Sequence, residues 1–221
     1  IDLYQVHWPE RPANFFGKLN YEHKICENII PISETLDALA ELVDEGLVKH
    51  IGISNETPWG LHEYLRLSRE QSMPRLVSIQ NAYNLLTRAY EVGLAEMGLR
   101  ESVGLLAYSP LAFGVLTGKY LGNQLPENSR LALWSRFSRY SSELATSATQ
   151  AYLEVAKKHS MSLAKMSLAF ICHQPFVASC LIGATTMEQL KENISSSDLI
   201  LSAEILDDIG KINSKFPSPA A

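Results

Sequence analysis

Residues 48–55 read VKHIGISN, a short run of mostly apolar and β-branched residues that ends in a serine and an asparagine. Similar short runs, each followed by polar residues, are found at 1–6, 76–80, 103–107 and 177–182. Runs that are apolar on both faces are typical of strands buried in a parallel sheet. The sequence therefore predicts five parallel strands with polar side chains just after their carboxyl ends.

Longer amphipathic segments lie between these runs and predict helices. Residues 33–46 begin with a potential N-cap, Ser33, continue with an apolar stripe that includes Leu36, and end at Gly46. Pro58 suits the first turn of a second helix. Further helical patterns cover 91–101, 145–160, 162–174, 186–197 and 202–213. Alternation of strands and helices predicts an α/β fold with right-handed crossovers.

Two architectures fit this alternation, an open doubly wound sheet and a closed (β/α)8 TIM barrel. No GxGxxG follows any of the strands, which argues against the dinucleotide-binding open sheet. In a barrel, all the strand ends lie on one rim, where active sites are found. A barrel has eight strands in about 250 residues, whereas this sequence predicts five. We therefore expect residues 1–221 to form one incomplete barrel domain, whose first three strand–helix units would precede Ile1.

Composition excludes several classes of partner. The chain is 46% hydrophobic with a net charge of −5, so it can bury a sizeable core and lacks a basic surface for nucleic acid. Its apolar runs are shorter than the roughly 18 residues of a membrane span, so we expect a soluble protein without a membrane partner. The three cysteines lack metal-ligand spacing, which favours free thiols in a reducing compartment and no metal site. We expect the cytoplasm, with a plastid or another organelle left open.

Taken together, the strand ends resemble the aldo-keto reductase family. The resemblance covers nearly the whole chain and includes the loop ERPANFFGKLNYEHK (10–24), which is similar to the Tas-like branch related to potassium-channel β subunits. In this family the fourth strand ends in HWP, so the chain is similar to the last five-eighths of the barrel. The matching motifs are DLYQVHWP (2–9), GISN (52–55), SIQNAYN (78–84), LLAYSPLAFGVLTGKY (105–120) and LIGATTMEQLKENI (181–194).

The resemblance implies hydride transfer from NADPH to the carbonyl carbon of an aldehyde or ketone, a small-molecule substrate. His7 matches the family's histidine that orients the carbonyl, and Trp8 would line the substrate pocket. A histidine at a strand end is otherwise most often structural or at the surface. The family's proton-donating tyrosine, with its lysine and aspartate, would lie on strands that this chain does not include. We therefore expect this chain alone to be inactive.

The resemblance also implies contacts to the nicotinamide. Ser54, Asn55 and Gln80 match the residues that hydrogen-bond its carboxamide, a planar group that needs both donors and acceptors. Ser54 and Asn55 could instead cap the helix that starts near Pro58. Tyr108 matches the aromatic residue that lies flat under the nicotinamide ring, and its alternative role is core packing.

Phosphate contacts are implied farther along the chain. Ser109, Leu111, Gly114 and Lys119 match the pyrophosphate site, where backbone N–H groups and one cation would face the anion. Lys119 could equally be a solvated surface lysine. The long segment 122–142 has little apolar periodicity, and in this family such a loop folds over the cofactor, with Arg130 as a phosphate contact.

The last motif implies contacts to the adenosine end of the nucleotide. Thr185 matches a 2′-phosphate ligand at a helix start, where the dipole attracts phosphate, and the other matches are Gly183, Gln189, Glu192 and Asn193. Other branches of the family have a lysine and an arginine where Gly183 and Gln189 stand here. The alternative is an ordinary amphipathic helix with a threonine N-cap.

Two other functions stay open. The protein could be a non-catalytic module that binds or senses nicotinamide nucleotides, or an inactive truncated product. His7 favours catalysis, because a non-catalytic member could carry asparagine there. The sequence identifies neither the physiological substrate nor the oligomeric state.

Overall fold

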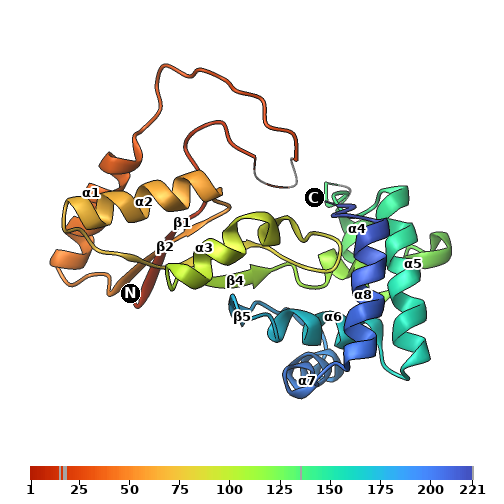
Figure 1. Cartoon of the computed structure of the whole chain (residues 1–221). Coiled ribbons are helices and arrows are strands. Elements are labelled where there is room, and N and C mark those ends of the chain that lie inside the picture. Colours follow the sequence, from red (N-terminus) through yellow and green to blue (C-terminus); the bar gives the residue numbers. More distant parts are fainter. Residues whose placement is uncertain (15, 17–18, 135, 221) are drawn as a thin grey trace. The chain divides into compact units, whose positions relative to one another are not determined.

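The computed structural model describes residues 1–14, 16, 19–134 and 136–220 (Figure 1). Its five strands form one sheet in the order β1-β2-β3-β4-β5, and β2 pairs in parallel with β1 and with β3. The predicted α/β fold with a parallel five-stranded sheet is confirmed. The strands are β1 (Leu3–Val6), β2 (His50–Ser54), β3 (Leu76–Ala82), β4 (Gly104–Tyr108) and β5 (Val177–Cys180).

The chain divides into two compact units. Unit 1 comprises Ile1–Asn81 and Glu91–Leu106, and unit 2 comprises Ala82–Tyr90 and Ala107–Ala221. The expectation of a single incomplete barrel domain stays a prediction.

In unit 1, helices α1 (Ile32–Asp44), α2 (Pro58–Glu70) and α3 (Leu94–Arg100) accompany the first strands. Strand β2 is buried along most of its length because it pairs on both sides. A Cβ on Gly52 would lie only 2.5 Å from Ser78 Oγ of β3, so glycine permits the close approach of the neighbouring strand. The core of this unit includes Leu36, Leu39, Ile51, Ile53, Leu61, Leu65, Leu76 and Ile79.

The predicted N-cap of the first helix is wrong. Ser33 lies inside α1, and Pro31 takes the extended backbone of the cap, with its carbonyl accepting the first helical hydrogen bond from Thr35. Proline suits this position because it has no N–H that would need an acceptor. Gly46 ends the helix as predicted, with φ at +71° and its N–H donating to Val43 O.

Unit 2 contains the short helix α4 (Arg130–Leu133) and four longer ones, α5 (Glu143–Lys158), α6 (Leu163–Cys172), α7 (Met187–Ser195) and α8 (Ala203–Lys215). Each of the four longer helices starts at a hydroxyl N-cap that accepts a hydrogen bond from a backbone N–H three residues later. Helices α5 and α8 lie side by side (Figure 1). Helix α6 is the most buried of them, and its Phe170 stacks with Tyr83.

The three cysteines, Cys26, Cys172 and Cys180, are free thiols. Within the part of the chain that the structure describes, every helix is too short or too polar to cross a membrane.

Candidate cofactor and active site

Residues at the carboxyl ends of β1, β2 and β3 are linked by hydrogen bonds in unit 1. Ser54 Oγ donates to Gln80 O over 2.7 Å, and the backbone N–H of Asn55 donates to the same carbonyl over 3.0 Å. The Asn55 side-chain amide donates to Ser54 Oγ over 3.0 Å and to His7 O over 2.9 Å. The structure therefore brings together four of the predicted site residues, which we call the strand-end cluster: His7, Ser54, Asn55 and Gln80.

Ser54 and Asn55 do not cap helix α2. The cap is Thr57, whose Oγ1 accepts a hydrogen bond from the N–H of Gly60. Asn55 takes the left-handed conformation with φ at +55°, which asparagine tolerates better than most residues. Both residues are 5% exposed, and their side chains are hydrogen-bonded between the strand ends rather than at the helix start.

His7 and Trp8 stand at the exposed end of β1. Their ring centroids lie 4.3 Å apart with a tilt of 39°, and the Trp8 and Phe16 rings are nearly perpendicular with centroids 6.2 Å apart. The His7 backbone is held by Asn55, while both side chains stay accessible to solvent. Accessibility suits a role in contact with substrate, and that role stays a prediction.

A buried ion pair beside the strand-end cluster was not predicted from the sequence. The Glu56 carboxylate accepts two hydrogen bonds from the Arg11 guanidinium, over 3.1 and 2.5 Å, and one from the N–H of Thr57 over 2.6 Å. Arg11 also lies 4.6 Å over the Trp59 ring. The sequence shows a charged residue, Glu56, directly after GISN. Its partner Arg11 lies 45 residues away in sequence, so no local pattern predicts the pair.

In unit 2, the segment that follows β4 has an unusual backbone. Ser109, Ala112 and Phe113 have φ values between +48° and +58°, and Gly114 reaches +93°. Such turns can aim successive N–H groups into a concavity that binds anions. The Leu111 carbonyl accepts hydrogen bonds from Gly114 and Leu116, which closes the turn. We call residues 109–119 the phosphate segment.

Lys119 is folded back against this turn. A Cβ on Gly114 would lie 3.1 Å from Lys119 Nζ, so the ammonium rests where a side chain at Gly114 would stand. The ammonium also lies 5.2 Å over the Tyr120 ring. The structure thus brings together Gly114 and Lys119, although Lys119 is exposed, as the alternative interpretation also expects.

Arg130 and Tyr108 are the remaining residues predicted near the phosphates and the nicotinamide. Arg130 starts α4, and its guanidinium lies 5.5 Å over Phe113 of the phosphate segment and 5.4 Å over Phe137. Tyr108 is half-buried, and burial raises the pKa of its phenol, while Arg139 acts in the opposite direction. Tyr108 is therefore neither a fully buried core residue nor a freely solvated one.

The predicted adenosine residues surround the start of α7. Thr186, rather than Thr185, is the N-cap, and it accepts from the Gln189 N–H. The Thr185 N–H and hydroxyl both donate to Gln189 Oε1, over 3.0 and 3.1 Å. Asn193 is 7% exposed and its amide donates to the Gly183 carbonyl over 3.3 Å.

These contacts divide the predicted adenosine set. Thr185 and Gln189 form one exposed pair, and the buried Asn193 amide fixes the loop that leads to them. The Glu192 carboxylate instead accepts a hydrogen bond from Ser162, the N-cap of α6. Glu192 thus has a structural partner that the sequence did not predict.

The aldo/keto reductase family model matches residues 1–214. The chain belongs to the aldo/keto reductase family. This membership confirms the resemblance that the strand-end motifs carry.

Curated relatives of the chain include Tas proteins and several proteins named as reductases. The protein Tas of Escherichia coli strain K12 is 50% identical over 220 residues, which cover 100% of this chain and 64% of Tas. An aldo-keto reductase of Babesia bovis is 39% identical over 89% of this chain and 74% of its own. An L-glyceraldehyde 3-phosphate reductase of E. coli strain K12 is 37% identical over 80% of this chain and 52% of its own. The chain thus spans less than two thirds of the length of Tas.

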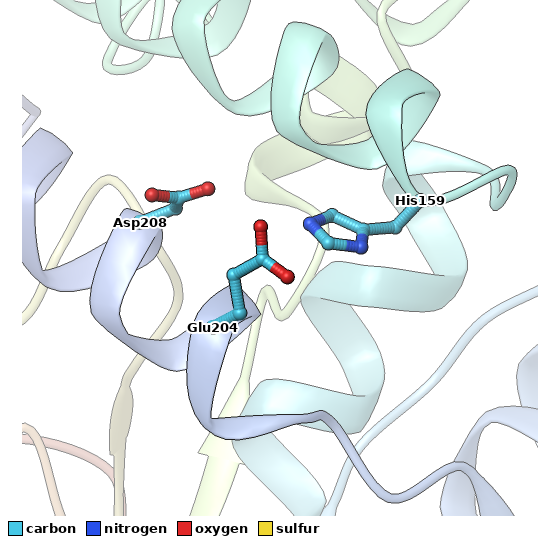
Figure 2. A group of neighbouring side chains, drawn as sticks. All are labelled: His159, Glu204 and Asp208. Atoms are coloured by element: carbon cyan, nitrogen blue, oxygen red, sulfur yellow. The ribbon is translucent and has the colours of Figure 1, made fainter.

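One group in the described residues of the chain has the spacing of metal ligands. His159, Glu204 and Asp208 each offer a ligand atom within 4.8 Å of the others, and one ring nitrogen of His159 points toward the two carboxylates (Figure 2). Lys158, however, pairs with Glu204 over 2.7 Å and with Asp208 over 3.0 Å. Its ammonium lowers the pKa of both carboxyl groups. We interpret the group as an ion-pair network between α5 and α8.

Proposed function

We propose that the protein is an NADP(H)-dependent aldo-keto reductase that reduces aldehydes or ketones to alcohols, and that this chain is its carboxyl-terminal portion. The strand-end cluster carries the proposal. Its hydroxyl and amide groups supply the donors and acceptors that a nicotinamide carboxamide requires, and its Asn55 holds the backbone of His7. The cluster also includes the exposed imidazole of His7, which carbonyl reduction in this family needs.

The number of strands supports the second half of the proposal. The sheet has five strands against the eight of a barrel, and the chain spans 64% of Tas. The tyrosine, lysine and aspartate that the family resemblance implies would then come from the rest of the protein. Within this chain, His7 orients the substrate carbonyl and Trp8 lines the pocket.

The bound nicotinamide nucleotide supplies the hydride, and the residues of this chain hold its parts. Ser54, Asn55 and Gln80 would hydrogen-bond the carboxamide, and Tyr108 would contact the nicotinamide. The phosphate segment would offer backbone N–H groups to the pyrophosphate. Lys119 and Arg130 would add cations, whose hydrogen bonds to phosphate oxygens are strengthened by charge.

Preference for NADP rests on the start of α7. A helix start attracts negative charge, because its unpaired N–H groups and its dipole favour an anion. The exposed Thr185 hydroxyl and Gln189 amide stand beside it and can donate to a 2′-phosphate, which NAD lacks.

Replacement of Thr185 by valine in the full-length protein tests this placement. The change removes the hydroxyl with little change of volume, and a hydrogen bond to a charged group contributes roughly 1.5–3 kcal/mol. Affinity for NADPH should fall about tenfold or more, while affinity for NADH should stay unchanged. Titration of both nucleotides by tryptophan fluorescence measures this. Equal losses for both would show that the 2′-phosphate binds elsewhere.

The matched control is Thr186→Val, which removes the N-cap hydroxyl next in sequence. It should lower the free energy of unfolding by about 1 kcal/mol without changing the ratio of the affinities for NADPH and NADH. The activity itself is measured as NADPH oxidation by the full-length protein with 4-nitrobenzaldehyde. If neither nucleotide is oxidised with this or other reactive aldehydes, the proposed function is wrong.

A further inference from the structure

The ion pair between Arg11 and Glu56 joins the ends of three neighbouring strands in unit 1. Arg11 belongs to the segment that follows β1, and Glu56 lies directly after the residues that end β2. The Asn81 amide, at the end of β3, donates to the backbone carbonyl of Glu56 over 3.0 Å. The proposed chemistry assigns no role to any of these three residues.

The segment that carries His7 is therefore held at two points, four residues apart. At one end, the Asn55 amide donates to the His7 carbonyl over 2.9 Å. At the other end, Arg11 makes a two-pronged contact with the Glu56 carboxylate and donates to Thr57 Oγ1 over 3.0 Å. Because Asn55 and Glu56 are adjacent, both ends of the segment are held by one short stretch of chain.

The pair is built as a fixed element rather than as a chance surface contact. Glu56 is 4% exposed and the Arg11 side chain 18% exposed, and a charge buried this deeply is costly unless it is paired and hydrogen-bonded. The planar guanidinium fixes the angle of approach as well as the distance. Gly60 leaves the space, because a Cβ there would lie 2.6 Å from Arg11 Nη2.

We propose that Arg11 and Glu56 are positioning residues for His7. The pair fixes residues 7–11, and thereby keeps the His7 imidazole oriented toward the substrate carbonyl. The proposal rests on the proposed function, because it takes His7 as the group that meets the substrate. It adds that the orientation of His7 depends on a carboxylate that does not itself touch substrate or cofactor.

Glu56→Gln in the full-length protein is the first test. The variant keeps the shape and one oxygen acceptor for the Thr57 N–H, but it loses the charge that holds Arg11. Displacement of a catalytic group by about 1 Å can cost on the order of 10²-fold in rate, so kcat for an aldehyde should fall by about that factor. The dissociation constant of NADPH should stay unchanged. The matched control is Lys49→Ala, which breaks the exposed pair with Asp2 near the other ends of β1 and β2 and should leave kcat unchanged.

Two further measurements separate positioning from general stability. In a His7→Ala background, Glu56→Gln should cause no further loss of kcat, because residues that act through one group are not additive. The double variant Arg11→Met with Glu56→Gln removes both charges together, which often restores stability at a buried pair. Its Tm should recover relative to Glu56→Gln alone, while kcat should stay low.

The NMR signal of the His7 imidazole, assigned by its loss in His7→Ala, reads the orientation independently of turnover. It should shift in Glu56→Gln and stay in place in Lys49→Ala. The proposal is overturned if this signal is unchanged in Glu56→Gln, if the loss of kcat is equally large in the His7→Ala background, or if kcat recovers together with Tm in the double variant. A wild-type protein that reduces no carbonyl would refute the proposed function instead, and the NMR signal would still decide whether the pair orients His7.

Discussion

The strand-end cluster of unit 1 and the phosphate segment of unit 2 are built by different means. In the strand-end cluster, buried side chains such as Ser54 and Asn55 are hydrogen-bonded to backbone carbonyls, and a buried ion pair adjoins them. In the phosphate segment, the backbone itself takes left-handed conformations, and the cation Lys119 is exposed. The first arrangement is fixed by contacts within the chain. The second offers backbone N–H groups together with the exposed Lys119 side chain, which can still rearrange around an anion.

The largest effect expected from this difference is at Gly60. In Gly60→Ala, the new Cβ would overlap the Glu56 carboxylate and lie 2.6 Å from Arg11 Nη2, so the buried pair must separate. Breaking a buried ion pair costs roughly 3–5 kcal/mol, and the free energy of unfolding of the full-length protein should fall by about that amount. Urea unfolding measures it.

Gly210→Ala is the matched control for this change. Gly210 lies in α8 with no atom within 4 Å of the position of a Cβ, so alanine should stabilise the helix by about 0.5–1 kcal/mol. If both alanine variants have the same effect, the Arg11–Glu56 pair is not the rigid element that distinguishes unit 1.

The second effect is expected in the phosphate segment, at Gly114. A Cβ there would lie 3.0 Å from Lys119 Cε on a backbone with φ at +93°, so Gly114→Ala should displace the ammonium. Loss of one hydrogen bond to a charged group corresponds to about tenfold in affinity. NADPH and NADH should be affected alike, because both contain the pyrophosphate. Fluorescence titration of the full-length protein with both nucleotides measures the change.

Gly122→Ala separates backbone strain from the contact with Lys119. Gly122 also has positive φ, at +68°, but no atom lies within 4 Å of the position of its Cβ. A left-handed alanine costs roughly 1–2 kcal/mol, so stability should fall while nucleotide affinity is kept. Equal loss of affinity in both variants would mean that strain, and not Lys119, explains the result at Gly114.

The sequence predicted the strands and most helices because those signals are local. Alternation of β-branched runs with amphipathic segments placed all five strands, and Gly46 marked the end of α1. Ser33 misled because a hydroxyl residue near a helix start was taken as the cap, whereas Pro31 fills that position. The left-handed conformations of Ala112 and Phe113 had no signal either, since neither residue favours positive φ.

The candidate site was predictable as a set of residues but not as a set of bonds. The family resemblance named Ser54, Asn55 and Gln80, and the structure shows that they bond to one another through a backbone carbonyl. The Arg11–Glu56 pair joins residues 45 positions apart. Such a contact depends on the pairing of β1 with β2, which no local pattern encodes.

The smallest effect is expected where unit 2 has its own ion-pair network, on the surface between α5 and α8. Lys158 pairs there with Glu204 and Asp208, and the ammonium lowers the pKa of both carboxyl groups from their ordinary values of 4.5 and 3.8. A carboxyl group with a lowered folded pKa contributes stability that is present above its unfolded pKa. That stability is lost as the pH falls through the folded pKa.

Lys158→Ala in the full-length protein should therefore lower Tm only slightly at pH 7, because exposed pairs contribute little and salt screens them. The difference from wild type should shrink in 1 M salt, and it should vanish as the pH falls through the lowered pKa values of Glu204 and Asp208. Scans of Tm at pH 7 and at successively lower pH, continued well below the ordinary values of both carboxyl groups, measure this. A difference that persists in acid would mean that the Lys158 stem stabilises the contact between α5 and α8 by packing. The network in unit 2 would then not be the screened, purely electrostatic contact that distinguishes it from the buried pair in unit 1.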